Sequence, residues 1–249
     1  MRKTPFVWLG SGRARKRDVG SFGILLDAAM RGRLPVPNGG ILLDDFYQIV
    51  REEEVVVVEN GRISIPDPNW LYNVLYRDIR FPHLTKLVAL RPLFSAPDSL
   101  DSKIGKTHLD VDFDDAFSLA YALESVWSPA LDLAAEWRRD LLVFEMVERQ
   151  VGGTAVTQTN QPTDEIYCDE DDHSFHPQKL KGFIPQVDQS LPIYVQRLQY
   201  LLSGIRRTLG KGDWTIEWID DGEICWLVQI SECKLPSARY SLITSGKRS

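Results

Sequence analysis

Apolar residues recur along this chain with two different spacings. A helical spacing, with apolar residues three or four positions apart, is found at residues 22–30, 114–127, 129–140 and 191–209. Short alternating or continuous apolar runs typical of strands are found at residues 41–43, 87–91, 107–111, 141–147 and 154–159. Helices and strands mix without the regular repeat of a doubly wound sheet. We therefore predict an α+β fold with mixed or antiparallel sheets.

Two further segments have the residues of β-hairpins. Asn60-Gly61, the dipeptide most typical of a two-residue hairpin turn, separates two short apolar runs. Residues 213–229 are rich in Trp, Ile and Val on both sides of Asp220-Asp221-Gly222. We predict a hairpin at each place, the second closed by a three-residue loop.

The loop length of the second hairpin decides where Glu217 and Gln229 point. An odd loop places both on one face of the sheet, together with Cys225 and Leu227, whereas an even loop places them on opposite faces. A carboxylate and a carboxamide on one face would suit Mg²⁺, which binds oxygen ligands. The alternative is that Glu217 is a solvated strand residue and Gln229 a strand end, and the hairpin alone leaves both open.

Composition narrows the class of protein. The 249 residues, 43% hydrophobic and 26% charged, are enough for one large domain or two lobes. A net charge of -6 argues against a nucleic-acid partner. No apolar run reaches the ~18 residues of a membrane span, so we expect no membrane partner. Three cysteines without metal-ligand spacing predict reduced thiols and a cytoplasmic location.

Two charged segments have more than one interpretation. The first seventeen residues contain six basic residues and no acid, which is typical of a phosphate-attracting arm or of a solvated terminus. Residues 164–176 contain six acids around Cys168, followed by His173 and His176. These three potential ligands do not have the spacing of a zinc site. We predict a solvated acidic loop.

Four segments follow one another along the chain: residues 25–47, 88–111, 126–153 and 215–229. In this order they resemble the ATP-binding, ATP-grasp domain of the phosphoenolpyruvate synthase and pyruvate phosphate dikinase family. Leu34-Pro35-Val36-Pro37, within residues 25–47, is similar to the family's "G-(L/F)-P-V-P" turn, and residues 88–111 resemble its "V-A-V-R-S-S-A" strand and the piece that follows. Residues 126–153 resemble the family's helix and its "V-Q-x-M-V" lid strands, and residues 215–229 its closing "D-I-E-W" hairpin. The resemblance covers most of residues 20–235.

The resemblance implies a two-lobed ATP-grasp-like fold with ATP between the lobes. The N-terminal lobe would be residues 1–140, with the Arg91 strand, and the C-terminal lobe residues 141–249, with the closing hairpin. Arg91 would be the phosphate-binding and catalytic residue, and Glu217 and Gln229 would bind ATP through Mg²⁺. Positioning and charge neutralisation by such groups are the main requirements of phosphoryl transfer. The phosphoryl acceptor would be a small molecule bound here, or a partner protein would supply the acceptor or carrier domain.

The sequence departs from the family pattern at several positions. Gly20-Ser21-Phe22 stands where the family has a phosphate-binding Lys, Ser231 where it has an Arg, and Phe144 where it has a Gln. The glycine-rich loop is replaced by the acidic stretch. Two functions are therefore open: an ATP-dependent phosphotransferase, or a degenerate non-catalytic ATP-grasp module that serves as an interaction or regulatory subunit.

Overall fold

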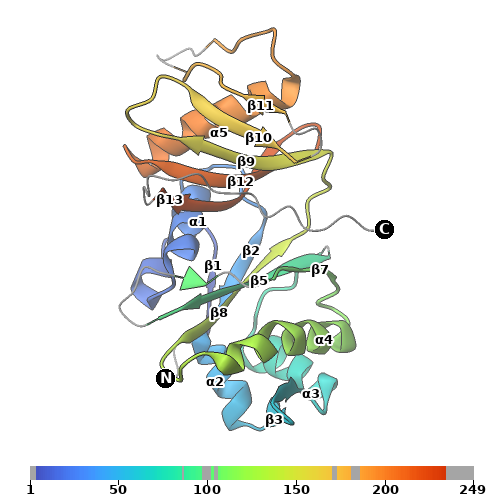
Figure 1. The fold of residues 1–249 in the computed structure, drawn as a ribbon. Helices are drawn as coiled ribbons and strands as arrows, with labels where there is room; N and C mark the ends of the chain where they lie inside the picture. The colour runs from blue at the N-terminus through green and yellow to red at the C-terminus, as the bar shows by residue number, and fades with distance from the viewer. Residues whose placement is uncertain are drawn as a thin grey trace.

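The computed structural model consists of two lobes, each built on an antiparallel sheet (Figure 1). It describes residues 4–85, 87–96, 102–103, 106–169, 173–180 and 186–233. The predicted α+β class with antiparallel sheets is confirmed.

The first sheet contains six strands in the order β1-β2-β8-β5-β6, and β7 also pairs with β5. Their bounds are β1 Phe6–Trp8, β2 Gly39–Leu42, β5 Val88–Ser95, β6 Ser102–Lys103, β7 His108–Val111 and β8 Arg138–Glu145. β2, β5 and β8 are buried on both faces over most of their length, as expected of central strands covered on two sides.

Helices and a small hairpin cover the lower face of this sheet in Figure 1. The elements are α2 (Asp44–Glu52), α3 (Pro68–Asn73), the π-helical turn η2 (Val74–Asp78), α4 (Ala116–Trp127) and the hairpin β3–β4 (Val57–Glu59, Arg62–Ser64). The side chain of Asp67 caps α3. The predicted Asn60-Gly61 turn is confirmed, with both residues at positive φ.

The second sheet has the order β11-β10-β9-β12-β13. The bounds are β9 Val151–Thr157, β10 Asp164–Cys168, β11 Ser174–Phe175, β12 Trp214–Asp220 and β13 Cys225–Glu232. One face packs against α5 (Ile193–Leu209) and α1 (Ser21–Arg31), so a helix from near the start of the chain completes the core of the second lobe. The turn η1 (Ala14–Arg17) precedes α1.

Two predicted elements are wrong. Residues 129–140 form the short turn η3 (Ser128–Asp132) and the start of β8 instead of a helix. Arg138 and Arg139 belong to β8, where they pair with Ser95 and Phe94 of β5. The solvated acidic loop predicted at residues 164–176 is wrong for its first part, since residues 164–168 form β10 and Asp164 is fully buried. Residues 170–172 lie outside the described part.

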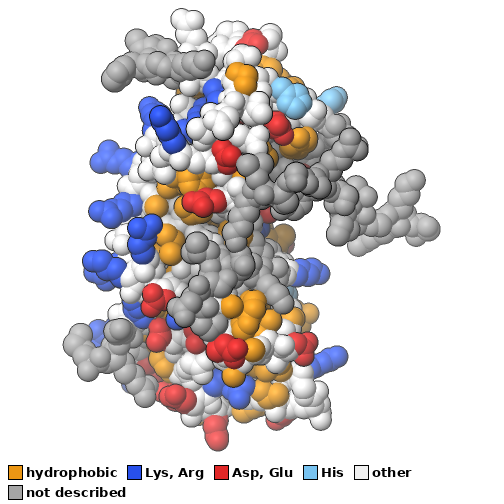
Figure 2. All heavy atoms as spheres, turned by 60° about the vertical axis from the view of Figure 1, so that its left-hand side comes forward, with side chains coloured by type: hydrophobic (Ala, Val, Ile, Leu, Met, Phe, Trp, Pro, Cys, Tyr) orange, Lys and Arg blue, Asp and Glu red, His pale blue; other side chains and the backbone are white. Residues whose placement is uncertain are grey.

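The predicted limit between the lobes at residues 140 and 141 stays a prediction, and β8 runs across it. Among the described residues, no helix is both long and apolar enough to cross a bilayer. On the face drawn in Figure 2, Lys and Arg side chains line one edge, and hydrophobic and acidic side chains lie next to one another in the half that holds the first sheet.

Candidate functional site

Glu217 and Gln229 are direct neighbours across the β12–β13 pair. The strands are joined by residues 221–224, so the predicted three-residue loop is wrong. An even loop alone would turn the two side chains to opposite faces. A β-bulge changes this outcome, because Val228 has no partner in β12 and adds one residue to β13. The two side chains therefore share one face.

The same bulge separates Glu217 and Gln229 from Cys225 and Leu227. The last two are buried in the core of the second lobe, whereas Glu217 and Gln229 are partly exposed. The prediction that all four share a face is wrong, because each residue between the loop and the bulge has the opposite orientation to the one predicted.

Arg91 reaches this face from the other sheet. It lies in the middle of β5, paired with Leu142 of β8, and its side chain is 13% exposed. One guanidinium nitrogen, Nη1, donates to Oε2 of Glu217 at 3.0 Å and to Oε1 of Gln229. Nε donates to Oγ1 of Thr107 at 3.0 Å. The structure thus brings the three predicted site residues into direct contact.

This contact determines which ligands the cluster can accept. Nη1 of Arg91 occupies one oxygen of Glu217 and the carboxamide oxygen of Gln229. A divalent cation at the same oxygens would be repelled by the guanidinium at this distance. Binding of Mg²⁺ by Glu217 and Gln229 therefore requires Arg91 to turn away. Within the described residues no three His, Cys, Asp or Glu side chains form a metal-binding group, so the rest of the shell would come from other oxygen donors.

A cavity of about 570 Å³ lies between the lobes, and Arg91, Glu217 and Gln229 are not among the residues that line it. Its walls are residues 37–38, the link between β8 and β9, and the turn of the β12–β13 hairpin. Four carboxylates line it: Glu145, Glu148, Asp221 and Glu223. Glu145 at the cavity wall is three residues along β8 from Leu142, the partner of Arg91, which is a distance of roughly 10 Å at the usual strand rise.

Two of these carboxylates are held by hydrogen bonds. Oε1 of Glu145 accepts from the backbone nitrogen and the hydroxyl of Thr85, at 3.2 and 3.3 Å. Oδ2 of Asp221 accepts from the Trp226 indole at 2.7 Å, and Oδ1 from the backbone of Ile224 at 2.7 Å. Burial acts to raise the pKa of Asp221, but these hydrogen bonds outweigh it and lower the pKa below its usual value. Asp221 is thus anionic at neutral pH and fixes the turn at the cavity wall.

The positions that depart from the family pattern carry no cation toward the cluster. Gly20 is the N-cap of α1, and the first turn of that helix follows it. Ser231 pairs with Thr215, two residues beyond the Glu217–Gln229 pair. Phe144 is 7% exposed and packs in the core beside Gly39. None of these positions therefore holds the Lys or Arg that the family pattern has there.

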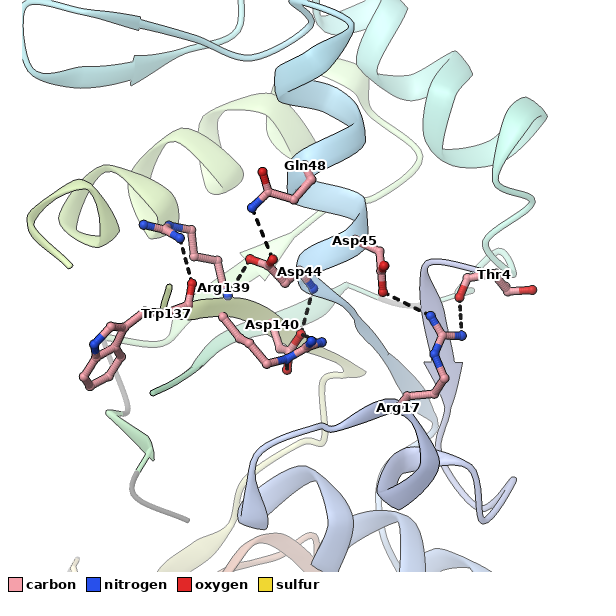
Figure 3. A network of polar contacts seen from close by, with 9 residues as sticks. Thr4, Arg17, Asp44, Asp45, Gln48, Trp137, Arg139 and Asp140 are labelled. Atoms are coloured by element: carbon pink, nitrogen blue, oxygen red, sulfur yellow. Dashed lines mark hydrogen bonds and ion pairs between the residues drawn. The ribbon is translucent and has the colours of Figure 1, made fainter. Parts of the chain in front are cut away.

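A second polar cluster lies where α2 leaves the first sheet (Figure 3). Oδ1 of Asp140 accepts from the backbone nitrogen of Asp44 at 2.7 Å, and Oδ1 of Asp44 accepts from the backbone of Arg139 at 2.9 Å. Burial raises the pKa of Asp140 to about 6, although the ion pair with Arg138 at 2.9 Å acts in the opposite direction. These reciprocal bonds fasten the first turn of α2 to β8, and Arg17 joins the outer edge through Asp45. We assign this cluster a structural role.

The comparisons with known proteins give weak likenesses only. No family model matches the chain, and a search of curated proteins found no match. Among solved structures, a D-alanine–D-alanine ligase from Bacillus anthracis is 12% identical with a TM-score of 0.43, and the match covers 90% of this chain and 58% of that one. A RimK domain protein ATP-grasp from Sphaerobacter thermophilus is 14% identical with a TM-score of 0.39, covering 84% and 57%.

A third similar structure is the carboxyaminoimidazole ribonucleotide synthase from Aspergillus clavatus complexed with ATP. It is 16% identical with a TM-score of 0.40, and the match covers 83% of this chain and 43% of that one. The chain thus matches less than two thirds of the length of each of these proteins. Likenesses at these scores do not place the chain in a family, and any function must be argued from the site itself.

Sequence reasoning missed Thr107 and the carboxylates of the cavity. Thr107 immediately precedes β7, which neighbours β5, so a correct strand pairing would have placed it beside Arg91. Three of the cavity carboxylates, Glu148, Asp221 and Glu223, come from a link and a turn that meet only through the packing of the two lobes. Glu145 ends a strand whose apolar pattern was visible, but nothing in its local pattern signals the cavity.

Proposed function

We propose that this chain is an ATP-grasp-like module that binds ATP and Mg²⁺ between its two lobes. The observation that carries the proposal is the convergence of Arg91, Glu217 and Gln229 from two different sheets. A cation with hydrogen-bond donors on one side and two oxygen donors on the other is what an anionic nucleotide with its metal requires.

The cavity between the lobes supports this proposal. Its volume is in the range of small-molecule sites, and Glu145 at its wall is three residues, roughly 10 Å, along β8 from Leu142, the partner of Arg91. With a base and ribose in the cavity, the phosphates would have to extend over this distance to meet Arg91. Carboxylates at the cavity wall disfavour phosphate there, which favours this orientation over the reverse.

Nucleotide binding would change the partner of Arg91. Mg²⁺, when bound, would neutralise charge on the phosphate oxygens, and Glu217 and Gln229 would be its ligands. Arg91 would then leave Glu217 and donate to a phosphate oxygen, while Thr107 keeps Nε of the guanidinium in place. The finer assignment, to a phosphotransferase resembling phosphoenolpyruvate synthase and served by a partner protein in the cytoplasm, is part of the same proposal.

A second candidate is the non-catalytic module. The observation that favours it is that Arg91 is already satisfied by Glu217, Gln229 and Thr107 without any ligand. Such an ion pair can simply fasten the two lobes. The absence of the family's Lys at residues 20–22 and of its Arg at Ser231 weakens phosphate binding in the same direction.

Calorimetric titration with ATP and Mg²⁺ separates the two candidates. We expect heat of binding for the unchanged protein, none for Glu217→Gln, and unchanged binding for Glu232→Gln, an exposed carboxylate on the same hairpin. Binding that needs Glu217 and Mg²⁺ together supports the nucleotide site. No binding at millimolar ATP, with all three proteins folded, supports the non-catalytic module instead.

A further inference from the structure

The guanidinium of Arg91 bridges the two oxygens that the proposed cation would need. Its nitrogen Nη1 donates both to Oε2 of Glu217, at 3.0 Å, and to Oε1 of Gln229. The two acceptors lie on one face of the second sheet, whereas Arg91 comes from β5 of the first sheet. A positively charged side chain of the protein thus takes the place of a metal ion at this pair of oxygens.

Only part of this guanidinium is used. Nε donates to Oγ1 of Thr107 at 3.0 Å, and Nη1 serves both Glu217 and Gln229. Nη2 of Arg91 makes no hydrogen bond to any residue that the structure describes, and it is not among the buried atoms that lack a partner. Nη2 is therefore open to solvent and free to donate to an incoming anion.

Two ion pairs of the second lobe are built differently. Arg197 donates through Nε and Nη2 to the two oxygens of Asp220, and Nη1 of Arg206 contacts both oxygens of Asp164. These two carboxylates are 2% and 1% exposed. Glu217 is 41% exposed and accepts through Oε2 alone. A single bond to a partly exposed carboxylate is exchanged for another partner at much lower cost than a two-oxygen contact to a buried one.

Charge determines when Arg91 can change its partner. Within the described part of the chain, Glu217 is the only carboxylate paired with Arg91, so the pair is neutral. A divalent cation added by itself would make the site strongly positive, and the guanidinium would repel it at this distance. A ligand with phosphate oxygens brings the missing negative charge and a new acceptor for Nη2. Cation and anion can therefore enter this site together, but the cation cannot enter alone.

We propose that Arg91 couples the binding of a divalent cation to the binding of a phosphate-bearing ligand. Arg91 keeps the cation away from Glu217 and Gln229 until phosphate oxygens draw the guanidinium aside, while Thr107 retains Nε. This inference rests on the proposed function in one respect, namely that Glu217 and Gln229 bind the cation. It adds that neither the free metal nor the metal with a nucleoside lacking phosphates binds to the protein.

Titration with Mn²⁺ alone, followed by the electron paramagnetic resonance signal of the free ion, tests the exclusion. We expect Arg91→Met, which keeps a long side chain but loses the charge, to bind Mn²⁺ at least about tenfold more tightly than the unchanged protein. Arg91→Gln, which keeps a donor toward Glu217, should show the same gain and replaces Arg91→Met if that variant does not fold. The control Arg91→Lys keeps the charge and should exclude Mn²⁺. Equal Mn²⁺ affinity in the unchanged protein and the folded neutral variants overturns the proposal.

A second variant and a second ligand complete the test. Adding Glu217→Gln to Arg91→Met should remove the gain in Mn²⁺ affinity, and a gain that persists overturns the assignment of the cation to Glu217. In equilibrium dialysis of the unchanged protein, we expect bound Mn²⁺ with ATP and none with adenosine. Mn²⁺ bound in the presence of adenosine also overturns the proposal.

The failure of this inference differs from the failure of the proposed function. If ATP and Mg²⁺ bind in the calorimetric titration, but Mn²⁺ alone binds equally to the unchanged protein and to Arg91→Met, the nucleotide site stands and the coupling through Arg91 is wrong. If no nucleotide binds, but Arg91→Met gains Mn²⁺, the proposed function is wrong and the exclusion of the cation by Arg91 stands.

Discussion

The ion pair between Arg91 and Glu217 should contribute measurably to the coupling of the two lobes. Arg91→Ala removes hydrogen bonds to Glu217, Gln229 and Thr107. Charge-assisted bonds are each worth about 1.5–3 kcal/mol when buried, but Glu217 is 41% exposed, so solvent screening reduces that contribution. We expect Arg91→Ala to lower the free energy of unfolding by about 2 kcal/mol, or the Tm by about 4–8 °C.

A double-mutant cycle isolates the pair itself. Urea unfolding, followed by tryptophan fluorescence, would be measured for Arg91→Ala, Glu217→Ala and the double variant. We expect a coupling energy of about 1 kcal/mol. The control cycle uses Arg17 and Asp45, an ion pair on the outer edge of the first lobe with exposures of 18% and 51%, where we expect less than about 0.5 kcal/mol.

The proposed exchange of partners needs a separate test, because Glu217 variants are expected not to bind the nucleotide. If Arg91 turns to a phosphate when ATP and Mg²⁺ bind, Arg91→Ala should weaken ATP affinity in the calorimetric titration by roughly tenfold or more. An unchanged affinity would refute the exchange. A coupling indistinguishable from zero in the absence of nucleotide would refute the premise that the pair fastens the lobes.

Two other predictions follow from the packing of the first lobe. Burial raises the pKa of Asp140 to about 6, so the folded state binds its proton more tightly than the unfolded state does. The resulting stabilisation of about 3 kcal/mol is fully present below the ordinary carboxyl pKa and is lost as the pH rises through 6. Relative to the unchanged protein, Asp140→Asn should therefore gain stability between pH 4 and 7; urea midpoints across that range check this, and parallel curves would contradict it. Gly39→Ala should lower the free energy of unfolding by at least about 2–3 kcal/mol, since a Cβ there would lie 2.1 Å from the carbonyl oxygen of Val143. Gly61→Ala, where φ is 72° but no atom lies within 4 Å of the added Cβ, should lower the free energy of unfolding by only about 1 kcal/mol. Thermal unfolding of both glycine variants checks this difference.

Local patterns were enough to predict most elements but not their continuation. The Asn60-Gly61 hairpin, α1 and α5 follow from turn residues and helical spacing alone. The helix predicted at residues 129–140 is wrong, because apolar residues with helical spacing there lie in the turn η3 and in the segment that leads into β8 at Arg138. The site depends on a feature with no sequence signal at all, the bulge at Val228, which is set by how β13 fits against its neighbours.

The position of α1 has a consequence for how the chain is made. Its apolar face is covered by β13 and α5, and the backbone nitrogen of Leu227 bonds to the carbonyl of Pro35 just after it. At ribosomal speeds of about 5–20 residues per second, α1 emerges roughly 10–40 s before these partners exist. Throughout that interval the apolar face of α1 has no partner in the nascent chain, so we expect any fragment that ends before residue 193 to leave that face exposed to water.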